Sequence, residues 1–376
     1  MSFLYDNIAT LAVAALVCTF AWLFGGTRGD LLMPTIPWLL FFLAEMMICF
    51  PQRHPGEPTV EARARVWSAL RKDPLTWVSV GFLLLLLIPF LNKGLCPICD
   101  YAEIPFQGAD PKPPIPFLPY CVNRLHHLNV CLWFFPALTA MLAVKHALVG
   151  RGKRLLLEIV VWNGALLGLL GIVQTATGAK GPLWIKSMVM PGHFFSTFGY
   201  PNMAGDYFTT LFGLSIALWR WTISQDDKVG NREVRTAHKD FWLRHIMLIP
   251  ALICFFSALA TLSRAAILLT ISLAIVFILH AYASFFKKMS RLKRVRVLFA
   301  SLVAVVALVL GLILWTPRDL QREVNTLNTT KILDRVTGRQ QYHVRVATEI
   351  WKENFLFGCG GWGYKHLCIP KMTKAE

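Results

Sequence analysis

A short segment between two apolar stretches, Thr261-Leu262-Ser263-Arg264, combines residue types that suit the binding of phosphate. The guanidinium of arginine stays charged at any physiological pH and presents a rigid fork of donors that matches phosphate oxygens. A charge this deep in an apolar region is expensive and by default faces a cavity or a partner. The simpler interpretation is an arginine that extends from a helix end into water. The tight Thr/Ser/Arg cluster favours phosphate binding, which makes Arg264 the first candidate and Ser263 a supporting residue.

A second segment, Ser196 to Gly205, contains a Gly-Tyr-Pro-Asn turn before a long apolar stretch. A proline at a helix start and a capping asparagine explain Pro201 and Asn202. Helix capping does not explain Lys186 and His193 upstream, which are interleaved with aromatic residues: Phe194, Phe195 and Phe198. We interpret this loop as an interfacial lid beside a lipid headgroup, with Lys186 and His193 near phosphate.

A third segment near the end of the sequence predicts an amphipathic helix over residues 339–354. Apolar residues at helical spacing form one face: Tyr342, Val346, Ile350, Ala347 and Trp351. Arg339 is the second candidate for binding phosphate, whereas Arg345 and Glu349 are spaced as an ordinary surface pair. The following Gly-Cys-Gly-Gly run predicts a tight turn and lacks the Lys-Ser/Thr of a P-loop.

The cysteines and carboxylates give no support for a metal site. Five cysteines lie in predicted external segments: Cys96, Cys99, Cys121, Cys359 and Cys368. The Cys-x-x-C pair lacks a convincing fourth zinc ligand although His126 and His127 are near it, and an oxidising compartment favours disulfides. No acidic cluster has metal-ligand spacing, so we predict neither a metal nor a cofactor.

The elements that must position these residues are membrane helices. The chain is 55% apolar and 16% charged, with a mean hydropathy of +0.51, far from a soluble domain. Stretches close to the ~20 residues of a spanning helix predict an all-α, polytopic membrane protein. The nine predicted spans are residues 9–24, 31–50, 75–91, 128–149, 155–175, 203–221, 246–262, 265–285 and 297–315. We therefore expect a helical bundle over 1–315 and an external segment over 316–376.

The net charge of +17 is a signal of topology and not of nucleic-acid binding, because the basic residues crowd into alternate loops. The basic loops are those near residues 53–72, 151–154, 220–244 and 287–296. With nine spans, this alternation places the N-terminus in the cytoplasm and residues 316–376 outside.

Together the three segments resemble the O-antigen ligase and polymerase superfamily of bacterial envelopes. The run Phe198-Gly199-Tyr200-Pro201-Asn202-Met203-Ala204 is similar to that family's F-G-N/Y-P-N-x-x-A signature. Thr261-Leu262-Ser263-Arg264 is similar to its T-x-S-R turn, and Gly338-Arg339 with Phe357-Gly358-Cys359-Gly360 to its G-R-x-x-W … G-x-G segment. The resemblance covers about residues 160–365.

The resemblance implies an inner-membrane glycosyltransferase that uses a glycan carried on undecaprenyl diphosphate and needs no metal. Arg264 and Arg339 would hold the diphosphate and stabilise the charge on the leaving group. The acceptor would be a glycolipid, the lipid A core, on the periplasmic side, where residues 316–376 would lie. Membrane lipids are the other expected partners, and nucleic acid is not one.

The sequence departs from the family in one respect. Family members continue into a histidine-containing H-N-x-x-L segment and further spans, and that histidine is given the role of activating the acceptor. His343 and His366 do not lie in such a motif, so no catalytic base is assigned. We expect the chain to be a fragment of a longer protein.

Four other functions stay open at this point. An O-antigen polymerase or a protein O-oligosaccharyltransferase would share the donor and differ in the acceptor. A lipid or sugar transporter would need internal symmetry and several charges at mid-membrane, which the sequence does not show. A non-catalytic envelope scaffold would tolerate the loss of Arg264.

Overall fold

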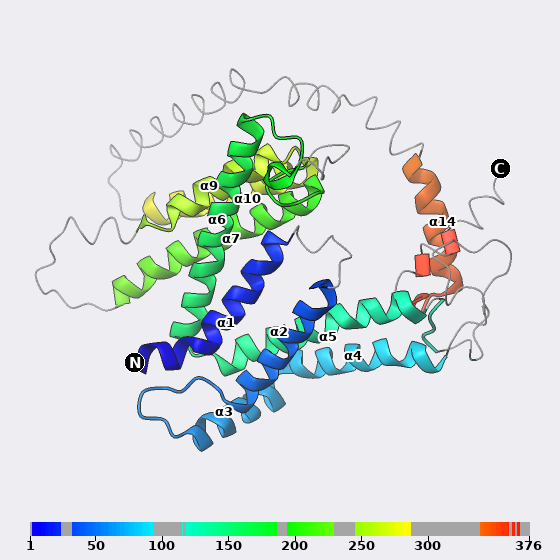
Figure 1. The fold of residues 1–376 in the computed structure, drawn as a ribbon, viewed down its shortest axis with the longest axis horizontal. Helices are drawn as coiled ribbons and strands as arrows, with labels where there is room; N and C mark the ends of the chain where they lie inside the picture. The colour runs from blue at the N-terminus through cyan, green and yellow to red at the C-terminus, as the bar shows by residue number, and fades with distance from the viewer. Residues whose placement is uncertain are drawn as a thin grey trace, which may run out of the picture. The chain divides into compact units, whose positions relative to one another are not determined.

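The computed structural model describes most of the chain as α-helices (Figure 1). The described residues are 2–23, 32–92, 115, 118–122, 124–185, 194–228, 245–286, 339–360, 363–364 and 367–368. Side chains within helices at residues 2–6, 32–34, 224–228, 281–286 and 339–342 are outside the description.

Ten α-helices and one short 3-10 helix make up the described part of the chain. They are α1 (Ser2–Trp22), α2 (Leu32–Cys49), α3 (Thr59–Lys72), α4 (Pro74–Leu91), α5 (Arg124–Ala147), α6 (Gly150–Ala176), η2 (Pro182–Trp184), α7 (Pro201–Lys228), α9 (Leu248–Ala260), α10 (Arg264–Phe286) and α14 (Arg339–Glu353).

The all-helical membrane class is confirmed for these residues. Three helices, Pro74–Leu91, Arg124–Ala147 and Gly150–Ala176, are long and apolar enough to cross a membrane. Four shorter apolar helices are Asn7–Trp22, Thr35–Cys49, Leu248–Ala260 and Arg264–His280. The predicted span at 297–315 and the domain boundary at 315 lie outside the described residues, so the count of nine spans stays a prediction.

Helix α3 was missed by the sequence analysis, which treated this stretch only as a basic loop. Its buried residues, Ala62, Val66 and Leu70, recur every four positions and occupy a narrow face. Five charged residues dominate the rest of the helix, so the stretch lacks the continuous apolar run of a span. A short amphipathic helix of this kind is stabilised by packing against its neighbours, which hydropathy does not report.

The chain divides into two compact units. The first comprises residues 1–16, 30–153 and 329–376, and the second residues 17–29 and 154–328. Within the first unit α2 and α4 pack on α5, and α3 contacts all three.

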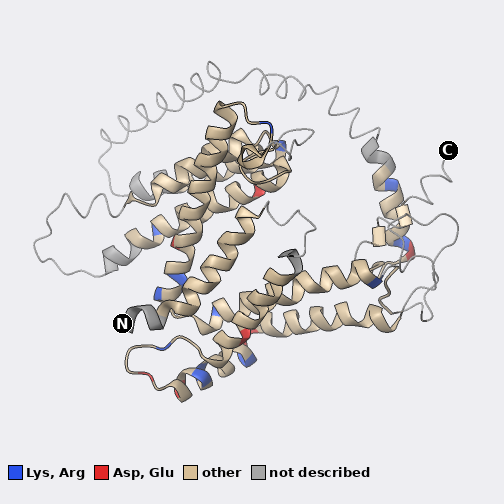
Figure 2. Ribbon diagram, in the orientation of Figure 1, with Lys and Arg blue, Asp and Glu red and all other residues tan. Residues whose placement is uncertain are grey.

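At one end of the first unit the junction between α3 and α4 holds a cluster of charges. Asp73 caps α4 by accepting a hydrogen bond from the Leu75 amide at 3.1 Å. Its carboxylate also accepts from Lys145 Nζ at 2.5 Å and contacts His146 Nε2 at 2.7 Å. Figure 2 shows the Lys and Arg positions on α3 and beside this junction. The hydrogen bond from Lys145, followed by that from His146, lowers the pKa of Asp73 from 3.8 to about 2.

At the other end of this unit Asn92 organises the segment before α5. Its buried amide donates to the carbonyls of Ile115, Leu118 and Pro119 at 2.9–3.3 Å. Its Oδ1 accepts from the Ile115 amide at 3.0 Å. The turn of Gly360, at φ 76°, lies against Tyr120 and Cys121, so the two segments predicted to be external meet at one end of this unit.

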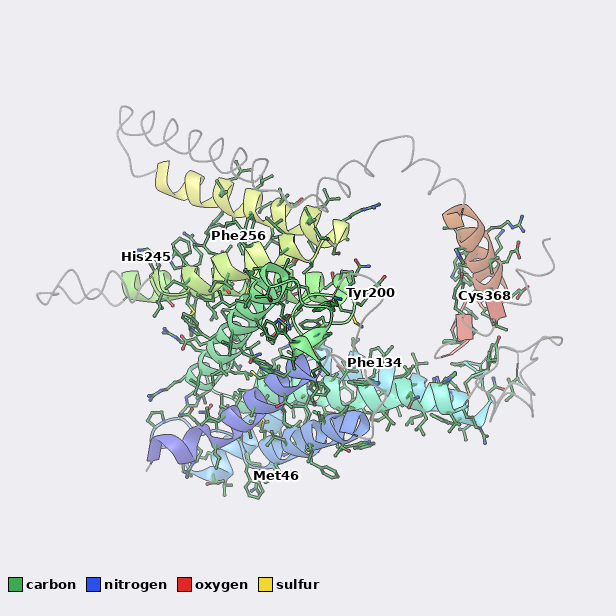
Figure 3. All side chains as sticks on the ribbon, turned by 45° about the horizontal axis from the view of Figure 1, so that its top comes forward. Met46, Phe134, Tyr200, His245, Phe256 and Cys368 are labelled. Atoms are coloured by element: carbon green, nitrogen blue, oxygen red, sulfur yellow. The ribbon has the colours of Figure 1, made fainter. Side chains whose placement is uncertain are left out.

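The second unit contains α6, α7, α9 and α10, and its helix ends gather in two groups. At one end Trp219 Nε1 donates to His245 Nδ1 at 2.9 Å, and the Arg154 guanidinium lies 5.4 Å from the centre of the Trp221 ring. Figure 3 shows Tyr200 and His245 at opposite ends of this unit. The helix ends near Arg154, Trp221 and His245 therefore meet, as expected from their assignment to one side of the membrane. Which end of the unit faces outward stays a prediction.

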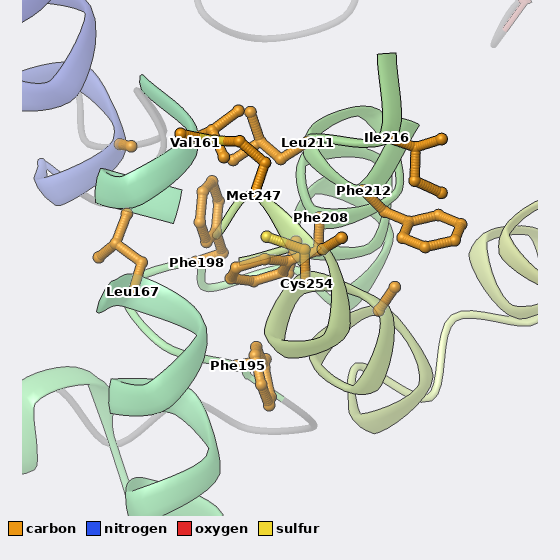
Figure 4. Close-up of a cluster of buried hydrophobic side chains, with 14 of the residues drawn as sticks. Val161, Leu167, Phe195, Phe198, Phe208, Leu211, Phe212, Ile216, Met247 and Cys254 are labelled. Carbon is orange, nitrogen blue, oxygen red and sulfur yellow. The ribbon is translucent and has the colours of Figure 1, made fainter. Parts of the chain in front are cut away.

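Aromatic and aliphatic side chains fill the core of the second unit (Figure 4). Phe195 and Phe208 meet edge to face with centroids 5.4 Å apart, and both are almost fully buried. Three glycines of α6, Gly164, Gly168 and Gly171, let other side chains approach its backbone closely. A Cβ at Gly171 would lie 2.4 Å from the Phe195 ring, so this glycine makes room for the loop before α7.

The end of α1 is tied to that loop by one buried hydrogen bond. Thr197 Oγ1 donates to the Ala21 carbonyl at 2.6 Å. Ala21 belongs to the last turn of α1, where the helix itself leaves carbonyls without partners.

Thr197→Val keeps the side-chain shape and removes this donor, so we expect it to lower the free energy of unfolding by about 1–3 kcal/mol. Thr197→Ser retains the hydroxyl and serves as the control. Thermal unfolding of the detergent-purified protein measures both variants, and equal melting temperatures for Val and Ser would contradict the assignment.

Asp73→Asn tests the charge cluster through its pH dependence. Because folding lowers the pKa of Asp73, its stabilising effect is fully present above about pH 4 and is lost as the pH falls towards 2. The melting temperature of the wild type should exceed that of the variant at pH 7, and the difference should shrink between pH 4 and 2. A difference in melting temperature that is the same at pH 7 and at pH 2 would contradict a stabilising role for the ionised carboxylate.

Candidate functional site

The structure describes three of the six predicted site residues with their side chains: Asn202, Ser263 and Arg264, all in the second unit. Lys186 and His193 lie outside the described residues. Arg339 is the first residue of α14 in the first unit, and its side chain is outside the description.

Helix α7 begins as the sequence predicts, with Pro201 at its first position. The Ala204 amide donates to the Tyr200 carbonyl at 3.2 Å and closes the first turn. Proline suits this position because its missing N–H would have no partner inside the helix. Asn202 is exposed, and its Nδ2 donates to the Tyr200 hydroxyl at 3.1 Å.

The turn before α10 is built from its own hydroxyl groups. Thr261 Oγ1 donates to the Ala258 carbonyl at 2.8 Å, and Leu262 takes a left-handed backbone with φ 59°. Ser263 caps α10: its Oγ accepts from the Ala266 amide at 3.4 Å, and its carbonyl accepts from the Ile267 amide at 2.9 Å. Ordinary turn and cap chemistry therefore accounts for Thr261 and Ser263.

Ser263 also joins the two helix starts, because its hydroxyl donates to Asn202 Oδ1 at 2.8 Å. Further along, Thr209 and Thr270 share a buried hydrogen bond of 2.6 Å. In both pairs the partners are 61 positions apart in the sequence. A constant separation means that α7 and α10 run parallel and in register.

Gly205 sets how closely the two helices approach. A Cβ at this position would lie 2.4 Å from Ala266 Cβ and 3.0 Å from Ser263 Cβ. Any larger residue would push the first turn of α7 away from the turn before α10. The close contact is what allows Asn202 and Ser263 to reach each other.

Parallel packing brings two helix N-termini together, each the positive end of a helix dipole. Arg264 is the first residue of α10 and is partly exposed at this place. A cation at a helix N-terminus is unfavourable by the dipole. The combination is suited to an anion with several oxygens, which would reverse this repulsion.

The lid interpretation of the loop before α7 is wrong for the part that the structure describes. Phe195 and Phe198 exchange backbone hydrogen bonds of 3.2 and 3.0 Å and are buried in the core. Ser196 and Thr197 are also buried. Phe195 and Phe198 therefore anchor this loop in the core of the second unit.

The predicted amphipathic helix is confirmed as α14. Val346 and Ile350 are buried with Tyr120 and Val122, whereas Trp351 is about half exposed. Arg345 and Glu349 form the expected surface pair at 3.6 Å. Since the buried face joins α14 to the segment before α5, the first unit fixes the helix that begins at Arg339.

Sequence reasoning missed Gly205, Thr209, Thr270 and Asn92. The signal for the first three is the repeated spacing of small and polar residues in two apolar stretches, which predicts close helix packing. Nothing comparable marks Asn92. Among the described ranges, no group of three or more His, Cys, Asp or Glu side chains is placed to hold a metal ion.

Gly205→Ala should separate the helix starts and lower the free energy of unfolding by about 1–3 kcal/mol, as overpacking usually does. Gly213→Ala is the matched control, because its Cβ would meet only the flexible end of Leu273 at 3.1 Å. Thermal unfolding measures both variants, and an undisturbed Gly205→Ala protein would contradict the close contact.

Comparison with known proteins gives one match, in the last third of the chain. Residues 249–375 match the family model described as O-antigen ligase. This stretch includes α9, the turn with Ser263, α10 and α14. Neither the curated proteins nor the solved structures gave a match. Over this stretch the family match confirms the resemblance to the O-antigen ligase superfamily found in the sequence.

Proposed function

We propose that the chain is a membrane glycosyltransferase of the O-antigen ligase type. It transfers a glycan from an undecaprenyl diphosphate carrier to the lipid A core. The observation that carries this proposal is the position of Arg264 at the start of α10, beside the start of α7.

The chemistry follows from charge. When the acceptor hydroxyl attacks the anomeric carbon, the bond to the diphosphate breaks and its oxygen becomes more negative. Fixed positive groups at that oxygen stabilise the transition state more than the ground state. In this proposal Arg264 and the two helix N-termini supply those groups, and Arg339 stays a diphosphate ligand proposed from the family resemblance alone.

The proposal includes the topology predicted from the charges. Nine spans, a cytoplasmic N-terminus and periplasmic residues 316–376 would place the starts of α7 and α10 on the outer side of the inner membrane. Arg154 and Arg220 at the opposite end of the second unit agree with a cytoplasmic face there. Lys186 and His193 stay proposed supporting residues of the loop before α7.

The donor half of the reaction is common to ligases, polymerases and protein O-oligosaccharyltransferases. Surface glycolipid from a strain that lacks the gene separates them. Loss of the long-chain ladder with free core retained indicates the ligase, and collapse to single-repeat bands indicates the polymerase. An unchanged ladder would contradict both, and glycosylated envelope protein would then be measured.

Arg264→Ala should reduce transfer by on the order of 10²–10³-fold at normal protein level, the usual cost of removing one preorganised group. Arg264→Lys keeps the charge but lacks the forked guanidinium, so its transfer activity should lie between that of the wild type and that of Arg264→Ala. The control is Arg345→Ala, an exposed arginine paired with Glu349. Complementation of the deletion strain, with protein quantified on blots, is the measurement; full activity of Arg264→Ala would favour a scaffold.

Asn202→Asp offers a test in which stability and activity change in different directions. An aspartate keeps the acceptor for the Ser263 hydroxyl and is favourable in the first turn of a helix. Its negative charge would repel a diphosphate held beside it. We expect an unchanged or higher melting temperature with transfer reduced at least tenfold, and unchanged transfer would place the anion elsewhere.

A further inference from the structure

Helix α3 lies at the end of the first unit where α2 and α5 end and α4 begins. Its buried face, Ala62, Val66 and Leu70, packs towards these helices. Arg63 Nε donates to the carbonyl of Cys49, the last residue of α2, at 2.9 Å. The helix is therefore fixed across the end of three apolar helices.

The opposite face of α3 is apolar in the middle and basic at its C-terminal end. Val60 and Trp67 are 77% and 46% exposed. A hollow of about 670 Å³ opens on this face, lined by Ala64, Trp67, Ser68, Arg71 and Lys72. Exposed tryptophan with neighbouring cations is typical of helices that lie in a membrane interface.

The nearby carboxylates do not neutralise Arg71 and Lys72. Asp73 is held by Lys145 and His146, and Glu57 by Arg65 at 2.9 Å. Within the part of the chain that the structure describes, neither Arg71 nor Lys72 forms an ion pair. The dipole of α3 explains basic residues at its C-terminal end but not the exposed apolar surface beside them.

The hollow lies beside the start of an apolar helix. Helix α4, long and apolar enough to span, begins at Pro74, two residues after Lys72. Trp77, in its first turn, is 60% exposed and donates Nε1 to the Arg71 carbonyl at 2.9 Å. A hollow at the start of a spanning helix lies where hydrocarbon meets headgroups.

We propose that this hollow binds the headgroup of an anionic glycerophospholipid. Arg71 and Lys72 contact the phosphate, Ser68 offers a hydroxyl to its oxygens, and Trp67 and Ala64 cover the glycerol and the first methylenes. A lipid fits better than a free phosphate because two of the five lining residues, Ala64 and Trp67, are apolar. This site does not depend on the proposed transfer reaction.

The test is native mass spectrometry of the detergent-purified protein titrated with dioleoylphosphatidylglycerol or dioleoylphosphatidylcholine. The wild type should bind phosphatidylglycerol more tightly. The double variant Arg71→Gln/Lys72→Gln should bind it roughly tenfold to thirtyfold more weakly, because each basic residue near an anionic headgroup contributes about fivefold. Arg345→Gln/Lys352→Gln removes the same charge from the exposed face of α14 and should bind as the wild type does.

The proposal would be overturned if the Arg71/Lys72 double variant bound phosphatidylglycerol as tightly as the wild type. It would also be overturned if the α14 control variant lost as much binding as the Arg71/Lys72 variant. Displacement of the lipid by millimolar inorganic phosphate would also overturn it, since the occupant would then be a free anion. A melting temperature like that of the wild type shows that the double variant is folded. Lipid binding is scored without transfer, so the two proposals fail separately.

Discussion

The arrangement of the second unit depends on one constraint: α7 and α10 run parallel, in register and in close contact. Parallel helices align their dipoles, and like ends repel. Three features offset that repulsion: the room at Gly205, the buried Thr209–Thr270 hydrogen bond, and the bond from Ser263 to Asn202. The same constraint leaves two positive helix ends and Arg264 side by side, where an anion would stabilise the arrangement.

The helices could be predicted from the sequence because a membrane leaves few choices. A backbone in hydrocarbon must satisfy its own hydrogen bonds, so each long apolar stretch becomes a helix. Eight predicted spans coincide with helices, and α14 follows its apolar spacing. Helix α3 could not be found this way, because its folding depends on a narrow face and on packing against α2, α4 and α5. The loop before α7 was misread for a related reason: exposed and buried phenylalanines look alike in sequence.

The residues of the candidate site could be predicted from their types, but the contact between them could not. The Thr261–Arg264 turn and Asn202 both stand out, since polar residues between apolar stretches require a reason. Their meeting depends on the register of two helices 61 positions apart, which a single sequence does not specify. The match to the O-antigen ligase model covers residues 249–375, the last third of the chain, and does not include the Asn202 segment.

The measurement that most directly tests the central claim is binding of undecaprenyl diphosphate to the purified protein, without any acceptor. The account predicts saturable binding that weakens at least tenfold in Arg264→Ala and is unchanged in Arg345→Ala. Binding of equal strength in all three proteins would mean that the paired helix ends do not hold the diphosphate. The role of Arg264 would then have to be structural.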